Sequence, residues 1–357
     1  MEFFIGTCAK IDQVGIVKQA EDTGVTHFGV GEGPLLFSDP YQYLALAARE
    51  TSTINLGTWV TNPLTRIPAV TANSHATLNA LAPGRTFLGI GTANNALRSM
   101  GHSPASVAQL DDALRVTTGL LAGRRVTEKW RGRERELEFL DKDGSWYNLD
   151  DPVPVWMAAG GPRGIKVAAR YADYVAYCLG PNPEMIKLVR RELDKAVADA
   201  GRPPGSVKLV AVSWFYQLRN GETWEDGVDH GFASGPISSC LTNIGFMRAH
   251  AAELDPSIVE ASATAATAYL GDPNAAEQPH YLDTWSKYQK GLDDSHLPLI
   301  TKQLCDYWCL YGSPGEIWEK AQGMLEAGVD MLSVFLSNPF TAERDIADIG
   351  TSILARA

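Results

Sequence analysis

A pair of glycines followed by proline, Gly160-Gly161-Pro162, is the first feature of the sequence that predicts chemistry. It follows an apolar run in "VPVWMAAGGPRGIKVAARYAD" and precedes a helical pattern that carries Arg163 and Lys166. Glycines let the backbone approach an anion, and the free N–H groups and dipole at a helix start favour negative charge. The motif indicates a phosphate site, although a tight turn without a ligand explains a bare GGP about as well.

A second glycine-containing segment, "GRTFLGIGTANN", ends an apolar run at Gly89-Ile90-Gly91-Thr92 and continues into Asn94 and Asn95. It does not match the six-position dinucleotide fingerprint, and Gly29-Val30-Gly31-Glu32-Gly33 fails as well because no helix opens there. At the carboxyl end of a barrel strand, however, glycines and polar residues often face a ligand.

Metal and disulfide chemistry have little support. The seven histidines are scattered and form no HExxH pair. The cysteines are odd in number and lie mostly in apolar surroundings, as expected of reduced thiols in a core. They are Cys8, Cys178, Cys240, Cys305 and Cys309.

Charge and hydropathy patterning exclude two classes of partner. The formal net charge is −11 and no long Lys/Arg run occurs, so we expect no nucleic acid partner. The segment "MEFFIGTCAK" has an acidic residue at position 2, and no long apolar stretch follows, so we expect neither a secretory signal nor a membrane span. These features predict a cytoplasmic protein.

The elements that must position these motifs are short apolar runs that alternate with helical patterns. Segments such as "IDQVGIVKQAEDTG" and "NPEMIKLVRRELDKAVADAG" have helical periodicity and end at glycine. The apolar runs are typical of strands buried on both faces. The eight predicted strands are Phe3–Thr7, His27–Gly31, Ile54–Thr61, Thr86–Gly91, Val153–Ala158, Tyr174–Cys178, Lys208–Trp214 and Met331–Leu336.

Eight strands alternating with helices predict an α/β protein with a (β/α)8 TIM barrel. One barrel can include all 357 residues, so we expect a single domain over 1–357. Two connections, roughly 93–151 and 220–312, are too long for simple loops and are predicted insertions at the C-terminal mouth. The second is expected to be a lid, a dimer contact or a solvated helical excursion.

Four blocks of the sequence together resemble a known family. They are "LGTWVTNPLTRIPAVTA", "LAPGRTFLGIGT", "VPVWMAAGGP" and "YGSPGEIWEKAQGMLEAGVDMLSV". In their order and spacing, over most of 1–217 and 310–355, the chain resembles the bacterial-luciferase-like superfamily of flavin and deazaflavin oxidoreductases. The likeness is greatest to methylenetetrahydromethanopterin reductases and deazaflavin-dependent glucose-6-phosphate dehydrogenases, and it is poor over 220–300.

The resemblance implies a cofactor site at the mouth of the barrel. The third strand would end in a bulge with a non-prolyl cis peptide at Trp59–Val60 that supports the flavin ring from one side. The indole would lie beneath the mouth or line the pocket, whereas the residues alone suggest an ordinary core tryptophan before an Asn-Pro turn. The residues implied to bind the cofactor are Trp59, Val60, Thr92, Ala93, Gly160, Gly161, Pro162 and Tyr177.

The sequence departs from this family at two places that carry catalytic groups in relatives. Deazaflavin enzymes have an Asp-His pair after strand two, where this chain has Gly31-Glu32, and the sugar-phosphate branch has a Glu where this chain has Asn94. Glu32 and Asn94 are therefore the candidate catalytic residues. Glu32 could act as an acid or base if burial raised its pKa, but a loop carboxylate is more often solvated or hydrogen-bonded.

Two reactions fit the resemblance. Reduced FMN from a separate flavin reductase could react with O2 to oxygenate a small organic substrate, or coenzyme F420 could exchange hydride with one. The absent histidine and glutamate favour the monooxygenase slightly, because it needs a protected apolar pocket more than a strong acid. The bulge and phosphate segments favour F420.

Other functions stay open. A degenerate barrel without redox activity predicts no tight flavin binding. A Schiff-base barrel is disfavoured because the only strand lysine, Lys208, lies at the wrong end of its strand. The superfamily also implies a homodimer.

Overall fold

The computed structural model describes the chain except for residues 142–145, 233, 272–279 and 287–295, and except for the side chain of Asn94. Among the described residues, every helix is too short or too polar to cross a lipid bilayer.

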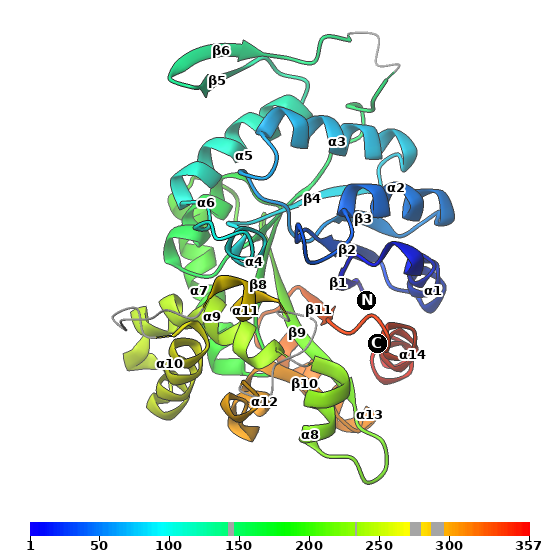
Figure 1. Ribbon diagram of the computed structural model, residues 1–357, viewed down its shortest axis with the longest axis vertical. Helices are drawn as coiled ribbons and strands as arrows, with labels where there is room; N and C mark the ends of the chain where they lie inside the picture. Colours follow the sequence, from blue (N-terminus) through cyan, green and yellow to red (C-terminus); the bar gives the residue numbers. More distant parts are fainter. Residues whose placement is uncertain (142–145, 233, 272–279, 287–295) are drawn as a thin grey trace.

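Eight parallel strands form a closed barrel, which confirms the predicted fold (Figure 1). Closure occurs at β9, which pairs with β8 through Lys208–Val212 and with β11 through Val210–Trp214. All eight predicted strands are present: β1 Phe3–Cys8, β2 His27–Gly31, β3 Asn55–Thr58, β4 Thr86–Ile90, β7 Val155–Ala158, β8 Tyr174–Cys178, β9 Lys208–Gln217 and β11 Met331–Leu336.

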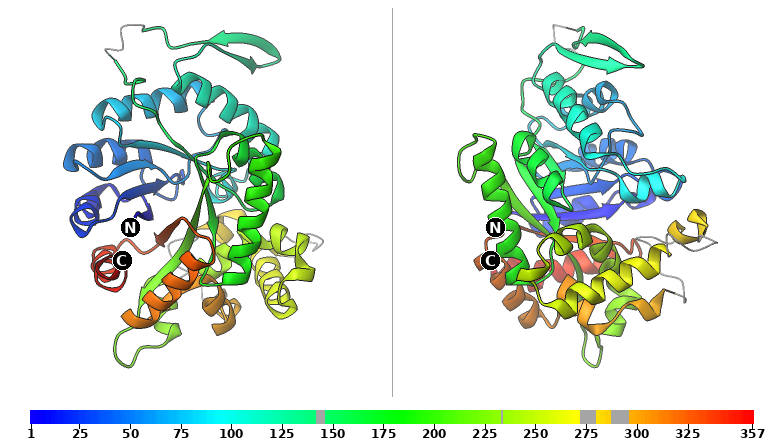
Figure 2. Two further views of the ribbon diagram at one scale, coloured as in Figure 1. Left: turned by 180° about the vertical axis from the view of Figure 1, so that it is seen from behind. Right: turned by 90° about the vertical axis from the view of Figure 1, so that its left-hand side faces the viewer.

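The helices between the strands cover the outside of the barrel (Figure 1, Figure 2). Five of them begin with proline at the first turn, where the missing N–H costs nothing, and Gly24 ends the first helix in the left-handed conformation at φ 97°. They are α1 Ile16–Thr23, α2 Pro40–Glu50, α3 Pro68–Leu81, α5 Val107–Leu121, α6 Pro162–Tyr171, α7 Pro183–Asp199, α13 Pro314–Glu326 and α14 Ala342–Ser352.

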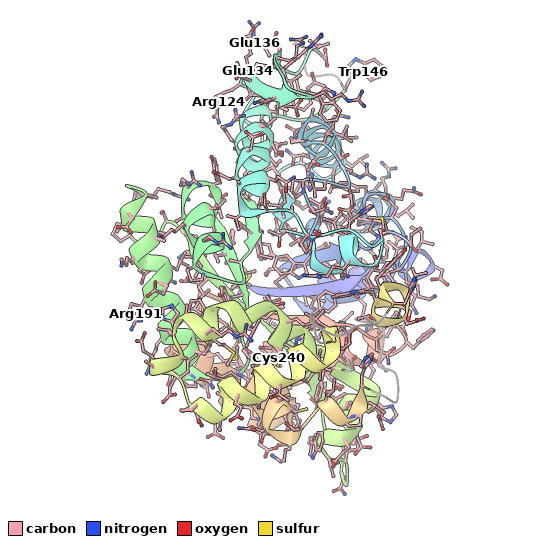
Figure 3. The ribbon with its side chains drawn as sticks, turned by 60° about the vertical axis from the view of Figure 1, so that its left-hand side comes forward. Arg124, Glu134, Glu136, Trp146, Arg191 and Cys240 are labelled. Atoms are coloured by element: carbon pink, nitrogen blue, oxygen red, sulfur yellow. The ribbon has the colours of Figure 1, made fainter. Side chains whose placement is uncertain are left out.

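Three strands were not predicted from the sequence. The hairpin of β5 (Val126–Trp130) and β6 (Arg133–Leu137) projects away from the barrel and carries Glu134 and Glu136 (Figure 3). Its strands carry alternating charges rather than an apolar run, and its turn depends on the positive φ of Arg131 and Gly132. The short strand β10 (Cys309–Gly312) extends the sheet by pairing with the end of β9.

The two long connections contain further helices. The first opens with α4 (Asn94–Arg98), and the second contains α8 (Trp224–Gly227), η2 (Val228–Phe232), α9 (Gly235–Ala249), α10 (Pro256–Leu270), α11 (Tyr281–Trp285) and α12 (Lys302–Trp308). Single-turn helices complete the chain at η1 Ile11–Gln13, η3 Ala251–Glu253, η4 Leu297–Leu299 and η5 Leu354–Arg356. The two connections meet where the guanidinium of Arg98 lies 5.9 Å from the Trp285 ring centroid.

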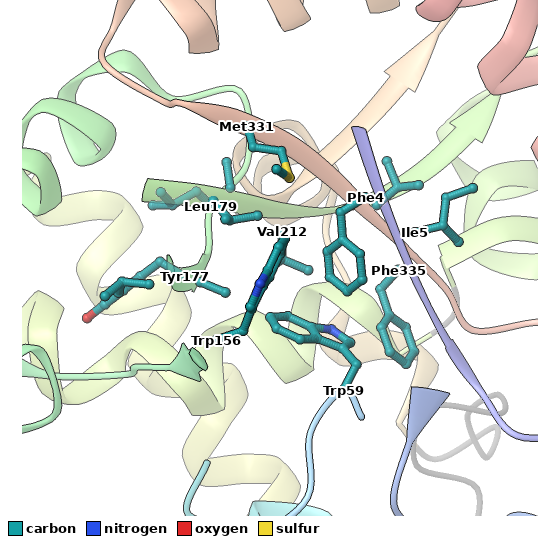
Figure 4. Close-up of a cluster of buried hydrophobic side chains, with 14 of the residues drawn as sticks. Phe4, Ile5, Trp59, Trp156, Tyr177, Leu179, Val212, Met331 and Phe335 are labelled. Atoms are coloured by element: carbon teal, nitrogen blue, oxygen red, sulfur yellow. The ribbon is translucent and has the colours of Figure 1, made fainter. Parts of the chain in front are cut away.

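Aromatic side chains fill the barrel interior (Figure 4). Phe4 lies edge-on to Trp59, with ring centroids 4.6 Å apart, and Trp156 stacks on Tyr174 at 4.2 Å. Such rings bury a large apolar area, so this cluster anchors the sheet from inside.

Candidate active site

The end of β3 forms a bulge at the C-terminal mouth. The ladder of β3 stops at Thr58, earlier than the predicted Thr61, and a single bridge to β4 resumes at Thr61. Between them the Trp59–Val60 peptide is cis, which confirms the geometry that the family resemblance implied. The bulge thus places two residues outside the regular sheet, at the end of the barrel where such folds build their sites.

Hydrogen bonds hold the bulge on both sides. Before it, the Trp59 amide donates to the Val30 carbonyl at 2.7 Å. After it, the Thr61 amide donates to the Gly89 carbonyl at 2.9 Å, and the Gly91 amide donates to the Thr61 carbonyl at 3.0 Å. The bulge is therefore tied to both neighbouring strands.

The Trp59 side chain turns into the barrel rather than outward. It is 8% exposed, and its ring centroid lies 6.2 Å from that of Trp156 (Figure 4). Glycine in β1 and β2 makes room for it, because a Cβ on Gly6 or Gly29 would lie 2.5 or 2.6 Å from Trp59 side-chain atoms. Of the two expected positions for the indole, the structure has the one beneath the mouth.

Three small residues from neighbouring strand ends meet above this indole. A Cβ on Gly91 would lie 3.1 Å from Cγ2 of Val60 and 3.4 Å from Cβ of Ala158. The ends of β3, β4 and β7 thus form an apolar floor, defined here as Val60, Gly91 and Ala158. A floor of small residues can accept the face of a flat ring at close range.

Beyond β4 the chain turns sharply. Ala93 adopts the left-handed conformation at φ 59° and precedes α4, and the Thr92 carbonyl accepts a hydrogen bond from the Ala105 amide at 2.9 Å. Ala93 is buried against Ala96 and Leu97, so its backbone rather than its methyl group is left to meet a ligand. The side chain of Asn94, a predicted catalytic residue, lies outside the described part of the chain.

The predicted phosphate site lies at the start of α6. No side chain among the described residues caps this helix at Gly161, and a Cβ at Gly161 would meet nothing within 4 Å. Gly160 differs, because a Cβ there would lie 2.6 Å from the carbonyl oxygen of Thr242 in α9. The helix start is therefore open to an anion, and the insertion after β9 forms one of its walls.

Tyr177 lies apart from the other predicted residues. Side chains alternate along a strand, and Tyr174 stacks on Trp156 inside the barrel, so Tyr177 points outward. Figure 4 shows Tyr177 directed away from Trp59 and Trp156. There it is 1% exposed and packs edge-on against Phe246 of α9 at 5.5 Å. Burial raises the pKa of its hydroxyl well above the ordinary value.

Glu32, the other predicted catalytic residue, lies directly after β2 and is 7% exposed. One carboxylate oxygen accepts from the Thr61 hydroxyl at 2.6 Å, and the other accepts from the Thr65 hydroxyl at 2.7 Å. Burial raises the pKa of Glu32, although these two hydroxyl groups and the charge of Arg66 act in the opposite direction. The structure thus brings Glu32 to the segment that follows the bulge.

A polar group behind the bulge was not predicted from the sequence. The Tyr41 hydroxyl donates to Thr61 Oγ1 at 2.9 Å, and the Arg66 guanidinium lies 4.0 Å from the Tyr41 ring centroid. Arg66 also pairs with Asp39 at 3.0 Å. The polar run "TNPLTR" after an apolar strand was the available signal, but it indicates only a turn until Glu32 and Tyr41 are placed beside it.

The described structure also has cavities away from the mouth. Cavities of about 630 and 140 Å³ lie at the N-terminal ends of the strands, which serve stability in barrel enzymes. The described His, Cys, Asp and Glu residues include no group of three that could hold a metal ion. The mouth around the apolar floor is therefore the candidate active site.

Curated relatives resemble parts or most of this chain. A 5,10-methylenetetrahydromethanopterin reductase of Methanolobus tindarius is 30% identical over 184 residues, which are 50% of this chain and 53% of the relative. The enzyme of the same name in Methanopyrus kandleri is 23% identical over 89% of this chain and 87% of its own. An F420-dependent glucose-6-phosphate dehydrogenase of Kineococcus radiotolerans is 36% identical, but over only 37% of this chain and 39% of its own.

The first of these alignments spans about half of the relative's length. Two solved structures have the same fold over nearly the whole chain. They are a coenzyme F420-dependent tetrahydromethanopterin reductase from Methanopyrus kandleri (TM-score 0.72, 20% identity, 99% of both chains) and a monooxygenase from Streptomyces bottropensis (TM-score 0.64, 18% identity, 100% of this chain and 99% of that chain).

The sequence profile of one family matches residues 11–331, which is most of the chain, and the barrel with its bulge after β3 agrees with that match. The chain belongs to the luciferase-like monooxygenase family of flavin- and deazaflavin-dependent oxidoreductases.

Proposed function

We propose that the protein is an oxidoreductase that binds a flat tricyclic cofactor at the mouth of the barrel and acts on a small organic substrate. The observation that carries the proposal is the apolar floor of Val60, Gly91 and Ala158 above the buried indole of Trp59. The cofactor ring would lie on this floor, and its phosphate would lie at the start of α6, against the backbone of Gly160, Gly161 and Pro162.

The residues fit such a cofactor. The floor offers no charged side chain, so a neutral ring loses little hydration by lying on it. Gly161 leaves open space at an uncapped helix start, where backbone N–H groups attract a phosphate. Trp59 closes the barrel below the floor and keeps water from reaching the ring from that side.

Coenzyme F420 is our first candidate, and when bound it would supply hydride transfer to or from the substrate. Support comes from similar proteins, since relatives and a solved structure are named as F420-dependent enzymes. The chain itself supplies the dry floor, the phosphate site and the walls that orient the substrate. Thr92 and Ala93 would border the ring from β4.

A monooxygenase that uses reduced FMN and O2 is the second candidate, and the sequence alone favoured it. Its support is that Gly31-Glu32 and Asn94 stand where the deazaflavin enzymes that the sequence resembles have an Asp-His pair and a Glu. This alternative would require a separate flavin reductase. The homodimer and the cytoplasmic location also stay predictions, as does the role of Asn94.

A cofactor titration with matched variants tests the proposal. FMN and coenzyme F420 are titrated separately into the wild type, and binding is followed by the change in cofactor fluorescence. Gly161→Ala should bind like the wild type, because the position has open space and an extended backbone that any residue adopts. Gly161→Asp should bind about tenfold more weakly or worse, since it places like charge beside the phosphate.

Each outcome bears on the proposal. Tight binding of F420 alone supports the first candidate, and tight binding of FMN alone supports the second. If neither binds, or if Gly161→Asp binds as tightly as Gly161→Ala, the proposed site is wrong.

A further inference from the structure

The loop that follows the bulge is organised by one asparagine. Asn62 Oδ1 accepts hydrogen bonds from the amides of Leu64 and Thr65, both at 3.0 Å, and its Nδ2 donates to Thr65 Oγ1 at 2.8 Å. Asn62 is fully buried, so this turn is a fixed unit. We refer to residues 61–65 as the bulge loop.

Glu32 is the attachment point of the bulge loop. It receives the hydroxyl of Thr61 at one end of the loop and that of Thr65 at the other end, at 2.6 and 2.7 Å. Asn62 Nδ2 lies 3.4 Å from one of the same carboxylate oxygens. A carboxylate accepts several hydrogen bonds at once, so a single ionised side chain can hold both ends of the loop.

The surroundings of Glu32 favour a holding role over proton transfer. Both oxygens accept hydrogen bonds from the loop, which fixes the buried carboxylate against residues 61–65. The charged and titratable groups nearby are Arg66, Asp39 and Tyr41, of which Arg66 and Asp39 pair with each other. Tyr41 is occupied as well, since its hydroxyl donates to Thr61.

We propose that Glu32 is a positioning residue, which fixes the bulge loop through Thr61 and Thr65 and thereby fixes the position of Val60 in the apolar floor. Thr61 connects Glu32 to the neighbouring strand end. Its hydroxyl donates to Glu32, and its backbone forms hydrogen bonds with Gly89 and Gly91 at the end of β4. The inference rests on the proposed function, since the floor is where the cofactor ring would lie.

A double-mutant cycle tests the link. Thr65→Val removes, at constant shape, the hydroxyl that donates to Glu32 and accepts from Asn62, and Glu32→Gln removes the charge and one acceptor. Each should weaken binding of the cofactor that the wild type binds, F420 or FMN, by about ten- to a hundredfold, the effect of one hydrogen bond to a charged group. The double variant should be no weaker than the worse single variant, because both changes break the same link.

Two controls separate this role from general destabilisation. Glu50→Gln changes an exposed carboxylate at the end of α2 and should leave binding unchanged. Hydrogen exchange at the Leu64 and Thr65 amides should speed up at least about tenfold in Glu32→Gln and in Thr65→Val, without any cofactor present. The visible absorption of bound cofactor should shift in both variants and return toward the wild type in Glu32→Asp.

Different results would contradict the proposed function and the positioning role of Glu32. If the wild type binds neither cofactor, the proposed function fails, while faster exchange in the loop still supports the attachment by Glu32. If the wild type binds but Glu32→Gln and Thr65→Val weaken binding independently, or leave both exchange and binding unchanged, Glu32 does not position the loop.

Discussion

The carboxylate of Glu21 provides a sharp test of how β3 is held at its start. Glu21 lies in α1, and one of its oxygens accepts hydrogen bonds from the amides of Ser52, Thr53 and Ile54 at 2.8, 2.6 and 3.0 Å. The Thr53 hydroxyl donates to the same oxygen at 2.9 Å. These residues form the turn that enters β3, the strand that ends at the bulge, so we predict that Glu21→Gln destabilises the protein.

The magnitude follows from the pKa of Glu21. Burial raises this pKa, but the hydrogen bonds from Thr53, Ile54 and Ser52 outweigh burial and lower it from 4.5 to about 2. At about 1.4 kcal/mol per pH unit, the ionised carboxylate stabilises the folded state by roughly 3 kcal/mol at pH 7. The side chain is 6% exposed but close to the surface, so screening makes about 2–3 kcal/mol the better expectation.

The assay is urea and thermal unfolding of the wild type and Glu21→Gln at two pH values. For 357 residues, a loss of this size lowers the Tm by roughly 3–4 °C at pH 7. Because the pKa of Glu21 is lower in the folded state, its charge stabilises the folded protein fully above the unfolded-state pKa near 4.5. This stabilisation is lost as pH falls toward 2. The difference between the two proteins should therefore fall to roughly half at pH 3.

Glu326→Gln, an exposed glutamate in α13, serves as the control and should leave the free energy of unfolding within about 0.5 kcal/mol of the wild type. Equal loss at pH 7 and pH 3, or no loss at pH 7, would show that the charge of Glu21 does not hold the turn.

Three further substitutions test the packing of the barrel interior, the phosphate site and the loss of stability at low pH. Trp59→Ala should cost about 3–5 kcal/mol in urea unfolding, because it leaves a cavity between the rings of the barrel interior; a loss below 1 kcal/mol contradicts the packing described. Gly160→Ala should displace α9 and weaken cofactor binding, because the new methyl group meets the Thr242 carbonyl, whereas Gly161→Ala should not. The Tm and the cofactor affinity of the two alanine variants, measured by thermal shift and titration, test this difference. Burial lowers the pKa of His27 to about 4, so its neutral form stabilises the fold above pH 6.5 and this contribution is lost as pH falls toward 4. His27→Gln should recover about 1–2 kcal/mol of that loss at pH 5. The same pH dependence of the free energy of unfolding in the wild type and in His27→Gln would contradict this.

Several features were predictable because the signal was local. Buried parallel strands require apolar runs, so "FFIGT" and "YVAYC" indicated strands wherever they were to lie in the sheet. The hairpin of β5 and β6 was missed for the opposite reason, since "VTEKW" and "REREL" are mostly exposed and carry no buried run. The cis peptide at Trp59–Val60 was predicted only through the family resemblance.

The sequence by itself determined the alternation of eight strands with helices and the glycine-containing turns at the strand ends, because each depends on residues within one short segment. The count of eight strands then predicted the barrel. Only the tertiary structure decided which way Trp59 and Tyr177 point, since the side of a strand that a residue occupies depends on how the sheet closes. It also decided that Glu32 meets Thr61 and Thr65, and that Thr242 meets Gly160. These residues lie between 29 and 82 positions apart, so the contacts exist only once the barrel has brought separate strand ends to a common edge.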